Sequence, residues 1–247
     1  MNRPLQRITV DPAQIQQGQL QLTPDQRHYL RRVLRLATTD RFIAQDGQGQ
    51  QWQAELQPQT DRAVLLAPLV AQPAGPPLTL AAALPKQGFD DVVRQVTELG
   101  VTTIQPLISD RTLLSPSDKK LERWRRIAQE AAEQCERSWV PTIHAPCPYR
   151  DWLSTLALEH PTRQTYLCVA RHQGRSFLSR LEENDLPFTE QEIIIAIGPE
   201  GGWTDEEITV AKMKGCIPIS LGSAILRATT AAVAAISVVS IKLSILS

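Results

Sequence analysis

The chain has 247 residues, which is enough for two domains of ordinary size, and its 42% apolar and 21% charged residues are typical of a globular protein. Its 26 Lys and Arg residues balance 26 Asp and Glu residues, so the formal net charge is zero. Because the net charge is zero, the chain cannot bind nucleic acid through a strongly basic overall charge. Any RNA contact must therefore depend on local patches.

The first third of the chain is expected to be mainly β structure. Strands are predicted at residues 41–46, 50–57 and 63–67. One helix is predicted over residues 23–36, because Thr23 is a suitable N-cap and Pro24 suits the first helical position. A small β-barrel with one helix fits this pattern.

Three prolines and one glycine within residues 72–77 interrupt regular structure, since proline removes a backbone donor and fixes φ. We therefore predict a first domain over residues 1–72, a linker at residues 73–77 and a second domain over residues 78–247.

Strands and helices alternate after the linker. Strands are predicted at residues 78–84, 103–107, 166–170, 192–197 and 217–221. Helices are predicted at residues 90–99, 119–137, 205–214 and 225–241. Continuous apolar strands between helices indicate an α/β domain with a parallel sheet that is covered on both faces.

Two glycine-bearing loops follow predicted strands of this sheet. The first, Gly198–Gly202, precedes a helix whose start carries a capping box of Thr204 and Glu207. The second loop contains Gly222. Ligands of open α/β sheets bind at the carboxyl ends of the strands, and glycine permits close approach to the backbone. Neither loop has the GxxxxGK[ST] or GxGxxG pattern of a phosphate site, so a ligand without phosphates, such as S-adenosylmethionine, fits better.

The last predicted helix has two unusual features. Arg227 lies at its start, where a cation is unfavourable to the helix dipole, so this residue is either a solvated surface charge or a ligand for an electron-rich group. Residues 228–241 carry no charge, yet a helix of this length spans only about 21 Å, short of a bilayer core. We expect it to be buried in the core or in a subunit interface.

These segments resemble the signature loops of the SPOUT methyltransferases, and most closely those of the RsmE family, which methylates N3 of a uridine in 16S ribosomal RNA. The similarity covers essentially the whole chain. The matching stretches are LPK at 84–86, TELGV at 97–101, IAQEAAEQCER at 127–137, IGPEGGWTDEE at 197–207 and LGSAILRATTA at 221–231.

The resemblance implies a PUA-like RNA-binding barrel at the N-terminus, a C-terminal trefoil knot, a homodimer and S-adenosylmethionine as the methyl donor. It implies that Arg227 is catalytic, with Lys86 and Glu98 as further candidates. The cofactor-binding residues that it implies are Ile197, Gly198, Glu200, Gly201, Gly202, Ser220, Leu221, Gly222, Ile225 and Leu226.

One position departs from the family pattern. Where the family usually has Thr-Glu-Thr-Ala, this chain has Ala-Thr-Thr-Ala, so Thr229 replaces a glutamate. Either that glutamate is dispensable, or the activity or the substrate of this protein differs from that of the family. Because the rest of the pattern is intact, we expect the glutamate to be dispensable.

Basic residues gather within the first domain despite the neutral total. Arg27, Arg31 and Arg35 would share one face of the predicted helix, and Arg32 lies beside them. Such a stripe neutralises RNA phosphates or is simply a solvated helix face, and the lack of interleaved Glu favours RNA. In a second basic patch at residues 119–126, Trp124 is interpreted as a packing residue.

The remaining expectations concern location and chemistry. The four histidines lack metal-ligand spacing and the four cysteines form no CxxC pair, so we predict no metal and reduced thiols. The N-terminus lacks the apolar core of a signal peptide, so the protein is expected to be cytoplasmic. Two alternatives stay open: a SPOUT methyltransferase acting on tRNA or a ribose 2′-hydroxyl, and a non-catalytic RNA-binding factor in ribosome assembly.

Overall fold

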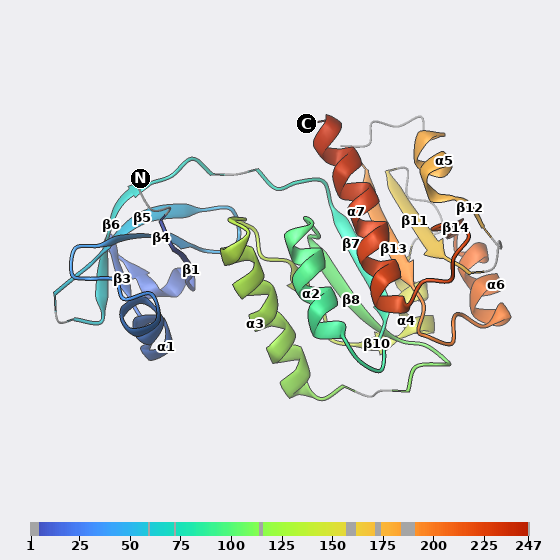
Figure 1. The fold of residues 1–247 in the computed structure, drawn as a ribbon, viewed down its shortest axis with the longest axis horizontal. Coiled ribbons are helices and arrows are strands. Elements are labelled where there is room, and N and C mark those ends of the chain that lie inside the picture. Colours follow the sequence, from blue (N-terminus) through green and yellow to red (C-terminus); the bar gives the residue numbers. More distant parts are fainter. Residues whose placement is uncertain are drawn as a thin grey trace. The chain divides into compact units, whose positions relative to one another are not determined.

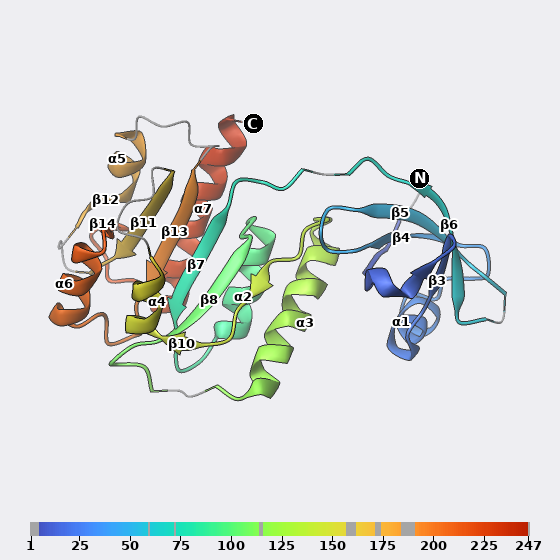
Figure 2. The same ribbon diagram turned by 180° about the vertical axis from the view of Figure 1, so that it is seen from behind.

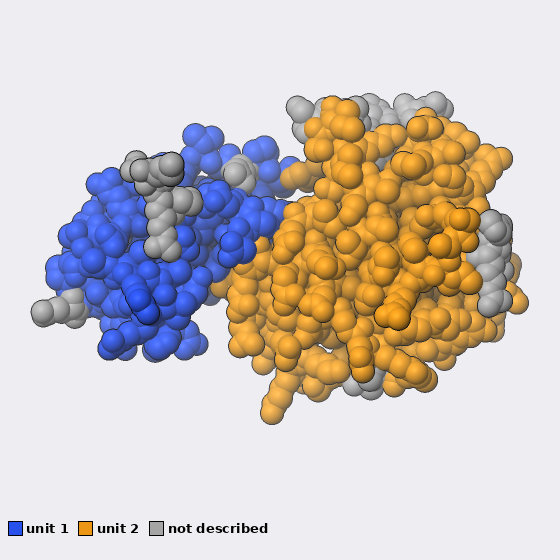
Figure 3. Space-filling view, viewed as in Figure 1, with its two compact units in different colours: residues 1–74, 132–140 blue, residues 75–131, 141–247 orange. Residues whose placement is uncertain are grey.

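The computed structural model describes residues 5–58, 60–71, 73–113, 116–156, 162–170, 174–183 and 191–246. The chain divides into two compact units (Figure 3). Unit 1 contains residues 1–74 and 132–140, and unit 2 contains residues 75–131 and 141–247. The return of residues 132–140 to unit 1 was not part of the sequence-based domain prediction.

Unit 1 is built on a six-stranded mixed sheet with the order β1-β4-β5-β6-β3-β2. Its strands are β1 (Arg7–Thr9), β2 (Ile15–Gln16), β3 (Gln19–Gln21), β4 (Arg41–Gln45), β5 (Gln51–Leu56) and β6 (Arg62–Pro68), with a 3₁₀ turn, η1, at Pro12–Gln14. The three predicted strands correspond to β4, β5 and β6, whereas the short β1, β2 and β3 were not predicted. Leu20, Leu30, Phe42 and Leu56 are fully buried at the centre of this unit.

The helix predicted over residues 23–36 is shorter than expected. The structure has α1 at Pro24–His28, followed by a π-helical turn, η2, at Tyr29–Val33. Thr23 forms the predicted N-cap and Pro24 the predicted first residue. Arg35 lies beyond the helical region with φ +56°, so the predicted stripe of Arg27, Arg31 and Arg35 on one regular helix is wrong.

Unit 2 has an eight-stranded sheet in which every pairing is parallel, which confirms the predicted α/β fold with a parallel sheet. The order is β10-β8-β7-β13-β11-β14-β12, with β9 paired to β8. The strands are β7 (Leu78–Ala83), β8 (Thr103–Ile108), β9 (Thr142–Ile143), β10 (Cys147–Pro148), β11 (Arg163–Cys168), β12 (Arg175–Ser176), β13 (Glu192–Ile197) and β14 (Ile217–Ser220).

Helices cover both faces of this sheet (Figures 1 and 2). They are α2 (Phe89–Glu98), α3 (Asp118–Gln134), α4 (Tyr149–Thr155), α5 (Phe177–Glu182), α6 (Asp205–Met213) and α7 (Ala228–Leu246). On one face α2, α5 and α7 pack together, and Lys242 of α7 donates a hydrogen bond to the carbonyl of Leu181 in α5 (2.5 Å). Helices α4 and α6 pack on the other face around Trp152 and Trp203.

The last helix differs from its prediction at both ends. It was predicted over residues 225–241, but it begins at Ala228 and continues to Leu246, beyond the uncharged stretch 228–241 whose length of about 21 Å was weighed against a bilayer. Among the described residues, its segment Ala228–Ile245 is the helix that is long and apolar enough to cross a membrane by length and composition. Only 22% of this segment is buried, and Ile241 and Ile245 are exposed.

Candidate functional site

The first glycine loop leaves the carboxyl end of β13, as predicted. Gly198 packs against the indole of Trp203 so closely that an added Cβ would lie 3.1 Å from the ring. Gly202 has φ +70° and closes a turn by donating its N–H to the carbonyl of Pro199 (2.8 Å). An added Cβ at Gly202 would meet nothing within 4 Å, so open space lies in front of this part of the backbone.

A buried carboxylate fixes the end of this loop. Glu207 is 2% exposed, and its two oxygens accept the backbone N–H groups of Thr204 (2.8 Å) and Asp110 (3.0 Å). The first contact confirms the predicted capping box of α6. The second ties the loop to the segment that follows β8.

Arg111 holds the middle of the same loop. Its guanidinium donates to the carbonyls of Gly201 (2.6 Å) and Trp203 (3.4 Å). Sequence reasoning missed both Asp110 and Arg111, because a single charged pair after a strand has no distinctive pattern. They could have been found from the predicted parallel sheet, because β8 ends at the same edge as β13 and the residues after both strands lie near a ligand bound there.

Trp203 connects the loop to β11 and to α4. Its indole N–H donates to the carbonyl of Cys168 (3.1 Å), and its ring stacks on Tyr149 at 4.5 Å. Burial raises the pKa of the Cys168 thiol and of the Tyr149 phenol, so both groups are neutral at physiological pH. These groups support the loop rather than carry charge.

The second glycine loop follows β14. The Ser220 hydroxyl donates to the carbonyl of Gly222 (3.0 Å) and accepts its N–H (3.3 Å), so the two residues form a closed turn. Gly222 has φ +133°, and an added Cβ there would meet nothing within 4 Å. Ile225 is 68% exposed, whereas Leu221 and Leu226 are half-buried, so apolar surface lies beside the turn.

Three loops at this edge of the sheet are linked to one another. The backbone N–H of Lys86, after β7, donates to a carboxylate oxygen of Glu200 in the first glycine loop (2.8 Å). Gly88 lies against Thr229 at the start of α7, since its added Cβ would be 3.3 Å from the Thr229 methyl group. The structure therefore brings Lys86, Glu200 and the start of α7 into one region.

Arg227 lies immediately before α7. Its carbonyl accepts the N–H of Ala231 (2.8 Å), which starts the helix, and its side chain is exposed. Glu98 is not brought to this region. It ends α2, whose ten residues run about 15 Å away from the loop that contains Gly88.

Lys86 also lines a hollow of about 490 Å³ within unit 2. Lys120 and Arg123 of α3 line the same hollow. Trp124 is 3% exposed and donates its indole N–H to Asp90 (2.9 Å), which confirms it as a packing residue.

Three of the four predicted RNA-binding arginines also meet at a hollow, in unit 1. Arg27, Arg31 and Arg32 line a space of about 350 Å³, and Arg35 is not among its lining residues. As for metals, the described residues contain no group of three or more His, Cys, Asp or Glu side chains that could hold one.

Glycine loops at the carboxyl edge of a parallel sheet are typical of α/β proteins that bind a ligand at this edge. The family model of the RNA methyltransferase domain matches residues 73–240 of the chain. A relative from Synechocystis, ribosomal RNA small subunit methyltransferase E, is 45% identical over 234 residues, which cover 94% of this chain and 76% of the relative. The relative of the same name from Rickettsia conorii is 30% identical and covers 94% of this chain and 93% of its own. The chain therefore belongs to the family of ribosomal RNA small subunit methyltransferases E.

Solved structures agree with this assignment. Ribosomal RNA small subunit methyltransferase E from Neisseria gonorrhoeae, bound to S-adenosylmethionine, matches with a TM-score of 0.81 and 26% identity over 95% of this chain and 96% of that one. A methyltransferase from Legionella pneumophila, also with bound S-adenosylmethionine, matches with a TM-score of 0.82 and 26% identity over 97% and 98% of the two chains.

Proposed function

We propose that this protein transfers the methyl group of S-adenosylmethionine to N3 of one uridine in 16S ribosomal RNA of the small subunit. The observation that carries the proposal is the meeting of the first glycine loop, Lys86 and the start of α7 at the carboxyl edge of the sheet. It stands in a chain that is 45% identical to a ribosomal RNA small subunit methyltransferase.

The loops fit S-adenosylmethionine. Open space lies before the backbone at Gly202 and Gly222, where side chains would otherwise block a ligand, and Ile225 offers apolar surface for an adenine ring. The residues that would hold it are Ile197, Gly198, Glu200, Gly201, Gly202, Ser220, Leu221, Gly222, Ile225 and Leu226. Bound there, S-adenosylmethionine supplies a methyl carbon activated by its sulfonium.

The protein must favour loss of the uridine N3 proton and direct N3 at that methyl carbon. The N3 lone pair forms the new C–N bond as the C–S bond breaks, and the N3 proton passes to a base or to water. Deprotonation places negative charge on the uracil oxygens. Arg227 stabilises this charge, with Lys86 as a second cation on the same side of the sheet. Glu98 has no part in this mechanism, because it lies at the far end of α2.

Three architectural features belong to the proposal. The mixed sheet of unit 1 is a PUA-like RNA-binding barrel over residues 1–72. A linker at 73–77 and a SPOUT methyltransferase domain at 78–247 follow it, except that residues 132–140 return to unit 1. A trefoil knot in that domain is supported by the sheet order, in which β13 and β14 each insert beside β11. The exposed apolar face of α7 supports a homodimer, and a protein that acts on ribosomal subunits would be cytoplasmic.

Methylation of small ribosomal subunits from a strain that lacks this gene tests the function. Purified protein and radiolabelled S-adenosylmethionine are incubated with the subunits or with protein-free 16S RNA, and the nucleosides are then separated. We expect label in 3-methyluridine. Label in another nucleoside, or label only on tRNA, would contradict the proposed target. Cofactor binding without any label on RNA would favour the non-catalytic assembly factor and direct attention to Thr229.

A further inference from the structure

Three of the six residues that line the hollow in unit 1 are arginines. Its residues are Arg27, His28, Arg31, Arg32, Thr60 and Asp61, and they surround about 350 Å³. The lining therefore contains three arginines and one carboxylate, that of Asp61. None of the lining residues is Phe, Tyr or Trp, and His28 is the one aromatic ring among them, so the hollow has little aromatic surface on which a base would stack.

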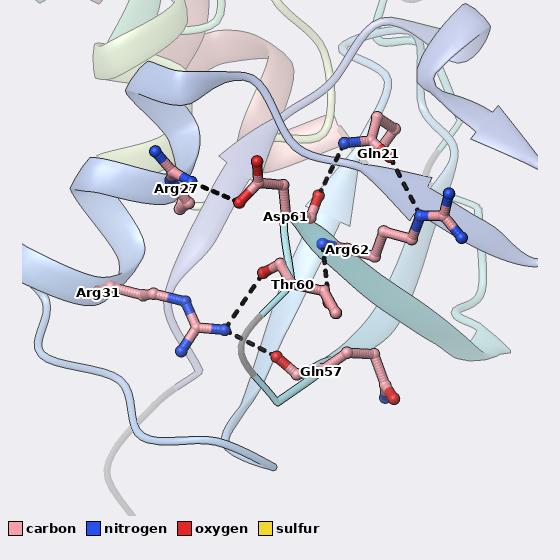
Figure 4. Close-up of polar contacts among 7 residues, drawn as sticks. All are labelled: Gln21, Arg27, Arg31, Gln57, Thr60, Asp61 and Arg62. Carbon is pink, nitrogen blue, oxygen red and sulfur yellow. Dashed lines mark hydrogen bonds and ion pairs between the residues drawn. The ribbon is translucent and has the colours of Figure 1, made fainter.

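Arg31 is held in place without losing its charge. Its guanidinium donates to the backbone carbonyls of Gln57 (2.7 Å) and Thr60 (3.4 Å), both neutral acceptors (Figure 4). A guanidinium has five N–H donors in a planar fork, so donors remain for a further ligand. Because the backbone already fixes the side chain, binding an anion costs little of its conformational entropy.

Arg27 is paired with the only carboxylate of the hollow. Its guanidinium lies 2.6 Å from Asp61, and the two side chains are 47% and 49% exposed (Figure 4). Half-exposed ion pairs contribute little free energy, so an anion with more oxygens can share this guanidinium.

Arg32 completes the set. Its side chain is exposed and makes no hydrogen bond or ion pair with any residue that the structure describes. It lies one residue after Arg31 in the π-helical turn η2, and both arginines line the hollow together with Arg27 and His28. Turns of this kind are frequent at functional sites.

We infer that this hollow binds a backbone phosphodiester of the RNA substrate through Arg31, Arg32 and Arg27, and that it does so without reading sequence. The inference rests on the proposed function in so far as RNA is the substrate. Fixed guanidinium groups around a polar hollow match the oxygens of a phosphate, and backbone contacts position a protein on RNA without specifying a base.

The experiment measures binding of the full chain to unmodified 16S RNA transcript over a range of salt concentrations. The variant Arg32→Gln removes one charge without breaking a contact to the described residues. We expect several-fold weaker binding and a log–log salt slope that is smaller by about 0.7, the value for one phosphate contact on single-stranded RNA. Arg32→Glu should weaken binding further.

Arg41→Gln is the matched control, because Arg41 is 54% exposed in β4 and does not line the hollow. Calorimetry with S-adenosylmethionine should give the same affinity for all variants. A salt slope unchanged in Arg32→Gln, or reduced equally in Arg41→Gln, would overturn the inference. So would tight binding of inorganic phosphate that Arg32→Gln abolishes while RNA binding stays intact, because the ligand would then be a free anion.

The salt slope of RNA binding is measured independently of methyl transfer. If no RNA is methylated but the salt slope falls as expected, the proposed activity fails and the phosphate site stands. If RNA is methylated but the salt slope of Arg32→Gln does not change, the proposed activity stands and the phosphate site fails.

Discussion

Arg227 is the residue on which the proposed chemistry depends most. It lies just before α7, beside the region where the Lys86 loop meets the first glycine loop, and its exposed side chain is available to a substrate. A cation at a helix start does not stabilise the helix, so its removal should not impair folding.

We expect Arg227→Ala to fold and to bind S-adenosylmethionine with unchanged affinity, while turnover falls about 100-fold to 1,000-fold, the usual cost of losing one donor to a developing oxyanion. Single-turnover methylation of 16S RNA, with calorimetry of cofactor binding, measures the two effects separately. Full activity in this variant would remove Arg227 from the mechanism.

The cysteines illustrate how burial controls reactivity. Burial raises the pKa of Cys216 to about 12, so at pH 8 only about one thiol in ten thousand is ionised. Alkylation of the folded protein at Cys216 should therefore be very slow and should rise about tenfold per pH unit between pH 8 and pH 11. Mass spectrometry of the alkylated peptides follows this rate, and fast labelling at pH 7 would show that the thiol is not buried as described.

The same group makes stability depend on pH. In the unfolded chain the thiol loses its proton near its ordinary pKa of 9, whereas in the folded protein it keeps the proton up to about pH 12. The unfolded state thus binds fewer protons in this window, so this thiol's contribution to the free energy of unfolding is lost as the pH rises from 9 to 12.

At the scale of elements, the first glycine loop depends on contacts from two neighbouring segments. Glu207 caps α6 and accepts the Asp110 N–H, while Arg111 holds two carbonyls of the loop. Glycines cannot hold such a conformation by themselves, because they are the most flexible residues in the unfolded chain.

We expect Glu207→Ala to lower the free energy of unfolding by about 1–3 kcal/mol, since it removes half of the capping box and leaves the partly buried N–H groups of Thr204 and Asp110 without their acceptor. The affinity for S-adenosylmethionine should fall with it, as the loop loses its fixed shape. Thermal unfolding and calorimetry measure the two quantities.

Glu206→Gln serves as the control for this change. Glu206 is the neighbouring exposed carboxylate, paired with Arg150 at 2.8 Å on the surface, and its loss should leave both quantities nearly unchanged. Equal effects of the two variants would mean that the buried contacts of Glu207 do not hold the loop.

At the scale of the whole molecule, the proposed homodimer predicts that the exposed apolar end of α7 is covered by the partner subunit. Ile241 is 59% exposed and Ile245 is 77% exposed on a helix with little charge. Ile241→Glu should shift the proposed homodimer toward monomer in sedimentation velocity. Met213→Glu, on the equally exposed end of α6, is the matched control and should leave the dimer intact. A dimer unaffected by Ile241→Glu would place the interface elsewhere.

Regular patterns in the sequence predicted much of this fold. The apolar run of β13 was placed at its observed limits, residues 192–197, and the capping box of Thr204 and Glu207 forms as expected. The helix at residues 23–36 was misjudged, because it changes to a π-helical turn after His28, around the buried Leu30, and no local pattern records such a change. The short strands β1, β2 and β3 are held by their neighbours rather than by their own propensity.

The sequence by itself determined the alternation of strands and helices, the two glycine loops and the family, since each depends on residues close together along the chain. Only the tertiary structure decided which of these segments meet. It joined Lys86 to Glu200 and Arg111 to Gly201, placed Glu98 at the far end of α2, and gathered Arg27, Arg31 and Arg32 around one hollow. Such meetings depend on strand order and on the packing of elements far apart in the chain, which local residue patterns do not encode.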